Sequence, residues 1–156
     1  MKERDREVTL RIVLVDPPPG VQFAVQRGRD ELVDRQIAGA AELRFDVAVQ
    51  VRGGEGDLDF RGPFVQGKRG DRFVYVNSST LAGQAGTAWT RRAKVKLGSL
   101  TLEMVDRALR EPAGVLEARI AGRAKDGGPA CATVPLLDGG WRVAATAPSS
   151  KTASPP

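Results

Sequence analysis

The chain has no histidine and a single cysteine, Cys131, among its 156 residues. The absence of histidine removes the side chain that most often acts as a general base or binds a metal, and with it every Ser–His or Cys–His catalytic pair. One cysteine cannot form a disulfide within the chain, and a zinc site built on thiolate and imidazole would have too few ligands. We therefore assign no catalytic residue, no metal site and no cofactor from the sequence.

The sequence also lacks long hydrophobic runs and has few aromatic residues. No stretch approaches the roughly 20 apolar residues that span a bilayer. The alternating charges of residues 1–7 are not followed by the apolar segment of a signal peptide. We therefore expect a cytoplasmic protein with no membrane partner. Aromatic residues make up only 5% of the chain, so its core must consist mainly of Val, Leu, Ile and Ala.

The positive charge is concentrated in one part of the chain. The formal net charge is +5, and residues 89–125 hold nine basic residues against four acidic ones, which accounts for the whole excess. A localised excess of this kind can attract an anionic partner. It is also typical of a surface that only keeps a protein soluble, and both interpretations stay open here.

Most of the chain shows the period-two pattern of β-strands. In residues 43–52, Phe45, Val47 and Val49 alternate with polar or small residues, as in a strand that lies on a core with one face. Residues 31–37 are more polar, and we interpret them as a helical turn. Similar alternation between turn residues predicts strands at 8–15, 21–26, 58–66, 72–76, 90–97, 115–120, 130–136 and 141–145.

One segment, residues 101–111, has the pattern of an α-helix. Leu102, Val105 and Leu109 recur at helical spacing and form one apolar face. Thr101 can cap the first turn, and a proline and a glycine follow the last.

These patterns predict a mainly β (α+β) fold. We expect a single antiparallel β-barrel or β-sandwich of about eight strands, with one packed α-helix near residues 101–111. Alternating β–α units are absent, which argues against Rossmann and TIM-barrel architectures. We divide the chain into a flexible N-terminus (1–7), a single β-rich domain (8–146) and a disordered, low-complexity C-terminal tail (147–156).

A basic strand follows Trp89. Alternation places Arg92, Lys94 and Lys96 on one face of the sheet. Such faces bind single-stranded nucleic acid when aromatic residues stack against the bases. Only Trp89 and Tyr75 could stack here, so we prefer a solvated face and do not expect nucleic acid as the main partner.

The loop at residues 125–129 contains two glycines that allow a ligand to approach the backbone closely. Asp126 precedes them, and we expect it to anchor the turn, with a lone carboxylate in a cleft as the alternative. Cys131 follows the loop between two alanines and is expected to be a buried packing residue, which would react only if it were exposed.

Seven segments of the chain belong together in a wider comparison: 15–21 (VDPPPGV), 59–67 (DFRGPFVQG), 72–76 (RFVYV), 91–97 (RRAKVKL), 116–119 (LEAR), 126–129 (DGGP) and 140–141 (GW). Together they resemble a family of small bacterial proteins that is known only as a domain of unknown function. The resemblance covers roughly residues 8–145, implies a bacterial single-domain protein, and carries no activity, cofactor or site.

We predict a non-catalytic binding module for a small or anionic ligand or an acidic protein partner. A barrel mouth or a cleft would hold the ligand, and homo-oligomerisation is left open. The predicted ligand-binding residues share charge or polarity and a place near turns: Arg61, Gln66, Lys68, Trp89, Arg91, Arg92, Lys125 and Asp126.

Two alternatives belong to other functional classes. The first is an enzyme without histidine, in which Asp126 or Asp59 acts as the base and Arg91 or Arg92 holds an anion. The second is a weak nucleic-acid binder that uses the basic strand at residues 91–96.

Overall fold

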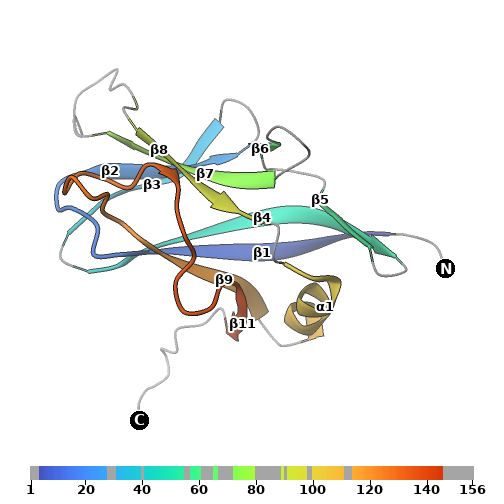
Figure 1. Ribbon diagram of the computed structural model, residues 1–156. Helices are drawn as coiled ribbons and strands as arrows, with labels where there is room; N and C mark the ends of the chain where they lie inside the picture. Colours follow the sequence, from blue (N-terminus) through green and yellow to red (C-terminus); the bar gives the residue numbers. More distant parts are fainter. Residues whose placement is uncertain are drawn as a thin grey trace, which may run out of the picture.

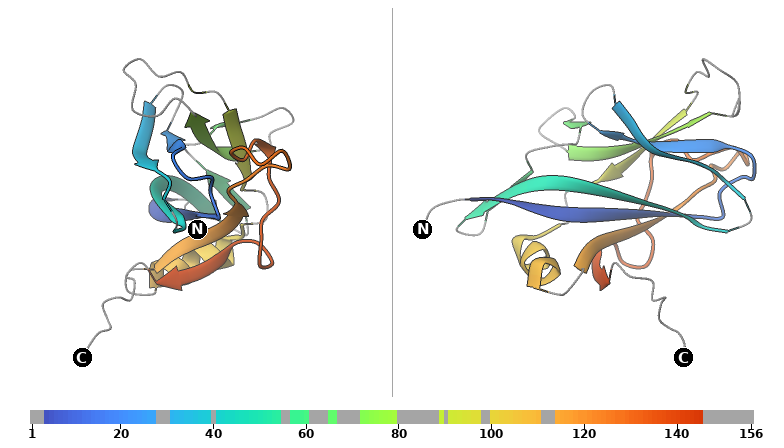
Figure 2. Two further views of the ribbon diagram at one scale, coloured as in Figure 1. Left: turned by 90° about the vertical axis from the view of Figure 1, so that its left-hand side faces the viewer. Right: turned by 180° about the vertical axis from the view of Figure 1, so that it is seen from behind.

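The computed structural model describes residues 4–27, 31–39, 41–54, 57–60, 65–66, 72–79, 89, 91–97, 100–110 and 114–145. Two β-sheets face each other, and one helix packs beside them (Figures 1 and 2). The elements are β1 (Arg4–Val15), β2 (Gln22–Arg27), β3 (Glu31–Ile37), β4 (Leu43–Gly54), β5 (Asp57–Phe60), β6 (Val65–Gln66), β7 (Arg72–Ser79), β8 (Arg91–Lys96), α1 (Leu102–Arg110), β9 (Gly114–Ala121), β10 (Ala132–Thr133) and β11 (Arg142–Ala145).

The two sheets have separate edges. The first sheet has the strand order β11-β9-β1-β4-β5, and the second has the order β10-β8-β7-β2-β3, with β6 beside β7. Because these strands do not form a closed sheet, the arrangement is sandwich-like and the predicted barrel is wrong. The prediction of purely antiparallel sheets is also wrong, because β1 pairs with β9, and β8 with β10, in parallel.

The antiparallel pairing of β1 with β4 confirms the strand that the alternation of residues 43–52 predicts. Phe45, Val47 and Val49 of β4 lie opposite Ile12, Leu10 and Val8 of β1, and all six side chains are buried in one core. Strand β1 begins at Arg4 and so includes part of the N-terminal segment that we expected to be flexible. Strands β1 and β4 form the centre of the first sheet, and the other strands of that sheet lie on either side of them.

Residues 31–37 form strand β3, so the predicted helical turn is wrong. Val33 pairs with Val25 of β2, and Gln36 pairs with Phe23, with a register shift between the two pairs. Asp34 has a φ of 57° at this irregularity. An extra residue in the left-handed region is how a β-bulge restores pairing after a break in alternation, so the irregular pattern reflects a bulge.

The segment predicted as one strand at 58–66 is divided between the two sheets. Strand β5 pairs with β4 in the first sheet, whereas β6 pairs with β7 in the second. The chain therefore changes sheets between residues 60 and 65. The predicted strand at 130–136 is reduced to β10, in which Ala132 has a φ of 63°. Prolines at 129 and 135 have no N–H to extend its pairing.

The helix lies where the sequence predicts it, and it closes part of the core. Thr101 Oγ1 accepts a hydrogen bond of 3.2 Å from the backbone N–H of Met104, which is the expected cap. Val105 and Ala108 are buried in the core, whereas Leu109 is 41% exposed and does not belong to the buried face. In the part of the chain described, no helix is long and apolar enough to cross a membrane.

Trp141 belongs to the core and supports strand β8. The side chain is buried, and its Nε1 donates a hydrogen bond of 3.0 Å to the backbone carbonyl of Lys96. Farther along the same strand, the carbonyl of Lys94 accepts a hydrogen bond of 3.1 Å from the N–H of Val134. These contacts hold β8 in place from the side opposite to β7, and thereby fix the side chains that β8 carries.

Candidate functional site

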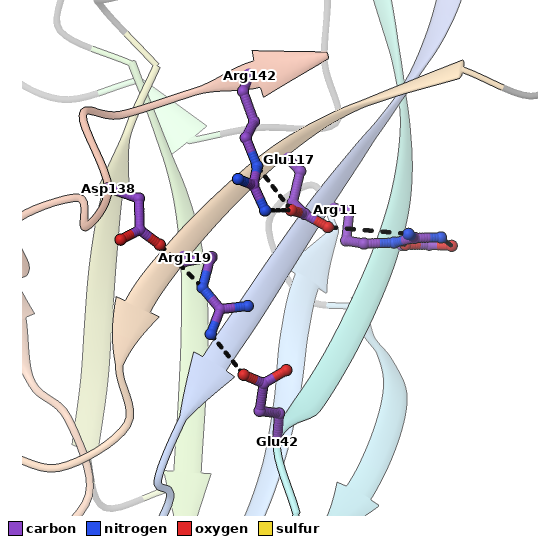
Figure 3. Close-up of polar contacts among 7 residues, drawn as sticks. Arg11, Glu42, Glu117, Arg119, Asp138 and Arg142 are labelled. Carbon is purple, nitrogen blue, oxygen red and sulfur yellow. Dashed lines mark hydrogen bonds and ion pairs between the residues drawn. The ribbon is translucent and has the colours of Figure 1, made fainter. Parts of the chain in front are cut away.

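The outer face of the first sheet carries a row of alternating charges across four strands (Figure 3). Arg142 of β11, Glu117 of β9, Arg11 of β1 and Asp46 of β4 are successive cross-strand partners. Arg142 Nη2 donates to Glu117 Oε1 over 2.8 Å, and Arg11 Nε donates to Asp46 Oδ1 over 2.9 Å. Arg11 Nη1 lies 3.9 Å from Glu117 Oε2. Every charge in the row thus has a neighbour of opposite sign.

A second ion cluster lies on the same face. Arg119 of β9 donates to Glu42 through Nη2, and its Nε lies 3.1 Å from Asp138 Oδ2 (Figure 3). These two carboxylates raise the pKa of Arg119 above its ordinary value, first through the hydrogen bond to Glu42. Each of the three arginines in these two clusters thus lies beside at least one carboxylate.

The outer face of the second sheet differs in composition. Val74, Val76, Ala93 and Val95 point into the core, so the alternate residues of β7 and β8 point away from it. Register pairs them across the two strands as Phe73 with Lys96, Tyr75 with Lys94, and Asn77 with Arg92. We call this surface the basic face, and define it by Phe73, Tyr75, Asn77, Arg92, Lys94 and Lys96.

Cations on the basic face lie against aromatic rings. The guanidinium carbon of Arg92 is 4.5 Å from the centre of the Tyr75 ring, and Lys94 Nζ is 5.8 Å from the centre of the Phe73 ring. Attraction between a cation and the ring quadrupole favours this geometry. Arg92 and Lys96 are exposed, whereas Lys94 and Tyr75 are half-buried. The six residues of the basic face include no carboxylate, so three positive charges stand there without a negative one.

A buried amide pair supports Arg92 from below. Arg92 Nε donates to Asn77 Oδ1 over 3.0 Å, and Asn77 Nδ2 donates to Gln26 Oε1 of β2 over 3.3 Å. Asn77 is 3% exposed and Gln26 is 7% exposed. The predicted strand at 72–76 stops just before Asn77, whereas β7 continues to Ser79, so this contact was not predicted.

Arg91 and Asp126, two of the predicted site residues, are brought together in a different place. Arg91 Nη2 donates to Asp126 Oδ2 over 2.6 Å, and Arg91 Nη1 also donates to the carbonyl of Pro129 over 2.9 Å. Asp126 Oδ1 accepts from the backbone N–H of Gly128 over 2.9 Å, so the predicted turn-anchoring role is confirmed. The hydrogen bond from Arg91, followed by that from Gly128, lowers the pKa of Asp126 from 3.8 to about 2.

Cys131 is exposed, and the prediction that it is a buried packing residue is wrong. Its Sγ lies 4.0 Å from Arg91 Nη1. The neighbouring Ala130 takes the buried position instead, and its N–H donates to the carbonyl of Gly122 over 3.0 Å. The chain then leaves the core side at Cys131, immediately before β10.

The other predicted site residues are dispersed. Trp89 precedes β8 but lies near Arg35 of β3, whose guanidinium carbon is 5.5 Å from the centre of the indole ring. Two strands separate β8 from β3 in the sheet. Lys125 is exposed beside Asp126, and Gln66 belongs to β6. Arg61 and Lys68 lie outside the described residues. The structure therefore separates Arg91 and Asp126 from Arg92, which belongs to the basic face.

Most of the chain matches one known family. Residues 8–144 match the profile of DUF5990, described as a family of unknown function. No curated protein and no solved structure matches the chain.

Proposed function

We propose a function for this chain, which belongs to the DUF5990 family of unknown function: it is a non-catalytic binding module whose basic face binds an anionic partner. The partner is a small anion, an acidic protein segment or another polyanion. The single observation that carries the proposal is a contrast between the two outer sheet faces. Arg11, Arg119 and Arg142 of the first sheet bind carboxylates, whereas Arg92 and Lys94 of the second lie over rings and Arg92 binds an amide.

The unbalanced charge gives the basic face an attraction for anions that the first sheet lacks. Arg92, Lys94 and Lys96 alternate along one strand, so their charges follow a line with a spacing of about 6.7 Å. Aligned charges of one sign raise the local concentration of an oppositely charged partner and speed its association. The hydrogen bonds of Trp141 and Val134 to β8 hold this line in place before the partner arrives.

The geometry at Asp126 favours binding over acid–base catalysis. A carboxyl group with a pKa of about 2 is a weak base at neutral pH. The Arg91 guanidinium that would hold a substrate anion is already occupied by Asp126. Asp126 and Arg91 are thus explained as a structural pair, and neither has to act on a substrate.

We further propose that the protein acts in the bacterial cytoplasm. An exposed Cys131 thiol suits a reducing compartment, in which such a thiol is not driven into a disulfide with another molecule. Fractionation of cells that produce the tagged full chain tests this location. Recovery in an extracellular or membrane fraction would contradict it.

Heparin chromatography tests the basic face, because heparin is a strong polyanion and elution by salt measures electrostatic binding. We expect the double variant Lys94→Glu/Lys96→Glu to elute at clearly lower salt than the wild type. The matched control is Arg107→Glu/Arg110→Glu, which changes the net charge equally at exposed positions of α1. Equal shifts for the two double variants would refute the proposal. Native mass spectrometry of the purified protein adds a direct search for a small anion that co-purifies.

A further inference from the structure

We infer that the anionic partner is single-stranded nucleic acid, and that Arg92 is the residue that anchors it. This inference rests on the proposed function of the basic face and names its ligand class. Positive charge alone does not carry the inference. It depends on the hydrogen bond that holds Arg92 and on the aromatic ring beside its guanidinium. From the sequence, nucleic acid is not the expected main partner, because only Trp89 and Tyr75 could stack; the structure adds the guanidinium plane of Arg92, which Asn77 holds.

Arg92 differs from the other arginines that have described side-chain hydrogen bonds. Six of them each bind a carboxylate, whereas Arg92 binds the neutral amide of Asn77. Its guanidinium is thus held in one orientation while its positive charge stays uncompensated by any described residue. The six carboxylate-bound arginines are Arg6, Arg11, Arg91, Arg119, Arg123 and Arg142.

The position of the hydrogen bond leaves the terminal edge of the guanidinium available. Asn77 accepts from Nε, and within the described residues no group accepts from either terminal nitrogen of Arg92. Two parallel N–H groups at that edge match two oxygens of a phosphate. Asn77 is itself held by Gln26, and both amides are buried, so the orientation of Arg92 is fixed before binding. A fixed side chain loses less entropy when it binds a ligand.

The planar and exposed guanidinium of Arg92 favours a nucleic acid over an acidic peptide. An acidic peptide would need only cations, whereas a single-stranded nucleic acid offers phosphates to cations and bases to planar groups. The Arg92 guanidinium lies over the Tyr75 ring, with its carbon 4.5 Å from the ring centre, and a guanidinium plane is itself a surface on which a base can stack. Lys94, beside Phe73, and Lys96 continue the line of charge along β8 and can follow a phosphodiester backbone.

Fluorescence anisotropy with the full chain and four labelled probes tests the ligand class. The probes are a deoxythymidine 12-mer, a uridine 12-mer, an abasic phosphodiester 12-mer and a glutamate 12-mer peptide. We expect the two base-containing strands to bind at least about tenfold tighter than the abasic strand and the peptide, because stacking adds to phosphate contacts. We also expect affinity for all four probes to fall as salt rises.

Substitutions at and below Arg92 test the anchor. Arg92→Lys keeps the charge but removes the planar group and the Nε donor, and we expect it to weaken binding of the deoxythymidine 12-mer by about tenfold. Asn77→Asp gives Arg92 a carboxylate partner like those that the other six arginines bind. We expect a similar loss of affinity, because the new carboxylate neutralises Arg92. The control is Arg44→Lys, the same change at an exposed strand position on the other sheet, which should leave affinity unchanged.

The outcomes separate this inference from the proposed function. If the peptide or the abasic strand binds as tightly as the deoxythymidine 12-mer, or if Arg92→Lys and Arg44→Lys behave alike, the inference is overturned. The proposed function still stands in that case if Lys94→Glu/Lys96→Glu weakens binding of the peptide. If none of the four probes binds the folded wild type, the inference fails, and the proposed function fails for every polyanionic partner. Thermal melting of each variant identifies a loss of fold at Asn77→Asp, and Arg92→Lys then decides the question alone.

Discussion

Arg91 and Asp126 are joined by two hydrogen bonds, from Nη1 to Oδ1 over 3.2 Å and from Nη2 to Oδ2 over 2.6 Å. The pair connects the start of β8 to the loop after β9, which are far apart in the sequence. Side-by-side contacts of this kind are stronger and more directional than a single ion pair. Arg91 thus takes part in holding a loop, while its sequence neighbour Arg92 extends from the other face of the same strand.

The carboxyl group of Asp126 is expected to titrate near pH 2 in the folded protein. Its pKa is lowered from 3.8, so this group stabilises the fold above about pH 4, and its contribution is lost as the pH falls from about 4 through about 2. Carbon-13 NMR of the side-chain carboxyl measures this directly. Arg91→Gln should return the pKa towards 3.8, whereas Arg123→Gln, which removes a nearby arginine bound to Asp16, should not. An unchanged pKa in Arg91→Gln would contradict the assigned cause.

The charged row on the first sheet is expected to depend most on Glu117. Glu117 is buried between Arg11 and Arg142, so Glu117→Gln weakens charge-assisted contacts to both and should lower the free energy of unfolding by about 2 kcal/mol. Arg142 is 55% exposed, and Arg142→Gln should cost less than about 1 kcal/mol because water screens the charge. Urea denaturation of both variants checks the order. A larger loss in Arg142→Gln would be inconsistent with this reading of the row.

Two glycine-to-alanine substitutions are expected to have opposite effects. A Cβ at Gly122 would lie 2.8 Å from the backbone Cα of Pro17, so Gly122→Ala should destabilise the protein by roughly 1–3 kcal/mol through overpacking. A Cβ at exposed Gly39 would meet no atom within 4 Å, so Gly39→Ala should be neutral or slightly stabilising. Thermal unfolding monitored by circular dichroism distinguishes them. Similar melting temperatures for the two variants would argue against the close approach at Pro17.

Cys131 is expected to react with a thiol reagent in the native protein. Its side chain is exposed, so a maleimide should label it at a rate close to that in urea-denatured protein. The matched control is Ala130→Cys in a Cys131→Ser background, which moves the thiol by one residue to a buried position. Mass spectrometry of timed samples measures both rates. Strong protection of native Cys131 would show that this part of the loop is covered.

Much of the fold could be predicted because one pattern dominates the chain. Phe45, Val47 and Val49 alternate without interruption, and a strand with one buried face is the simplest structure with that period. The helix at residues 102–110 has a cap, apolar spacing and a stop that agree with one another. Where several local signals agree, the structure follows them.

The predictions from the sequence are wrong where pairing between distant segments decides the structure. The polar pattern of residues 31–37 predicts a helical turn, but pairing with β2 and the bulge at Asp34 make them a strand. The parallel pairing of Leu10 with Leu116 leaves no local trace in either segment. Long-range pairing also decides the site. The sequence predicts Arg92 as a site residue from its charge alone. Its hydrogen bond to Asn77 depends on the register between β7 and β8, which spacing along the chain does not reveal.

The parallel contact between β1 and β9 has a consequence for biosynthesis. Strand β1 is synthesised well before β9, one of its two neighbours in the sheet, because β9 begins almost 100 residues after β1 ends. Until then the apolar edge of β1 is unpaired, and an exposed strand edge is a template for association with other chains. The nascent chain thus passes through a period, before β9 is synthesised, in which a chaperone bound to β1 would protect it from association with other chains.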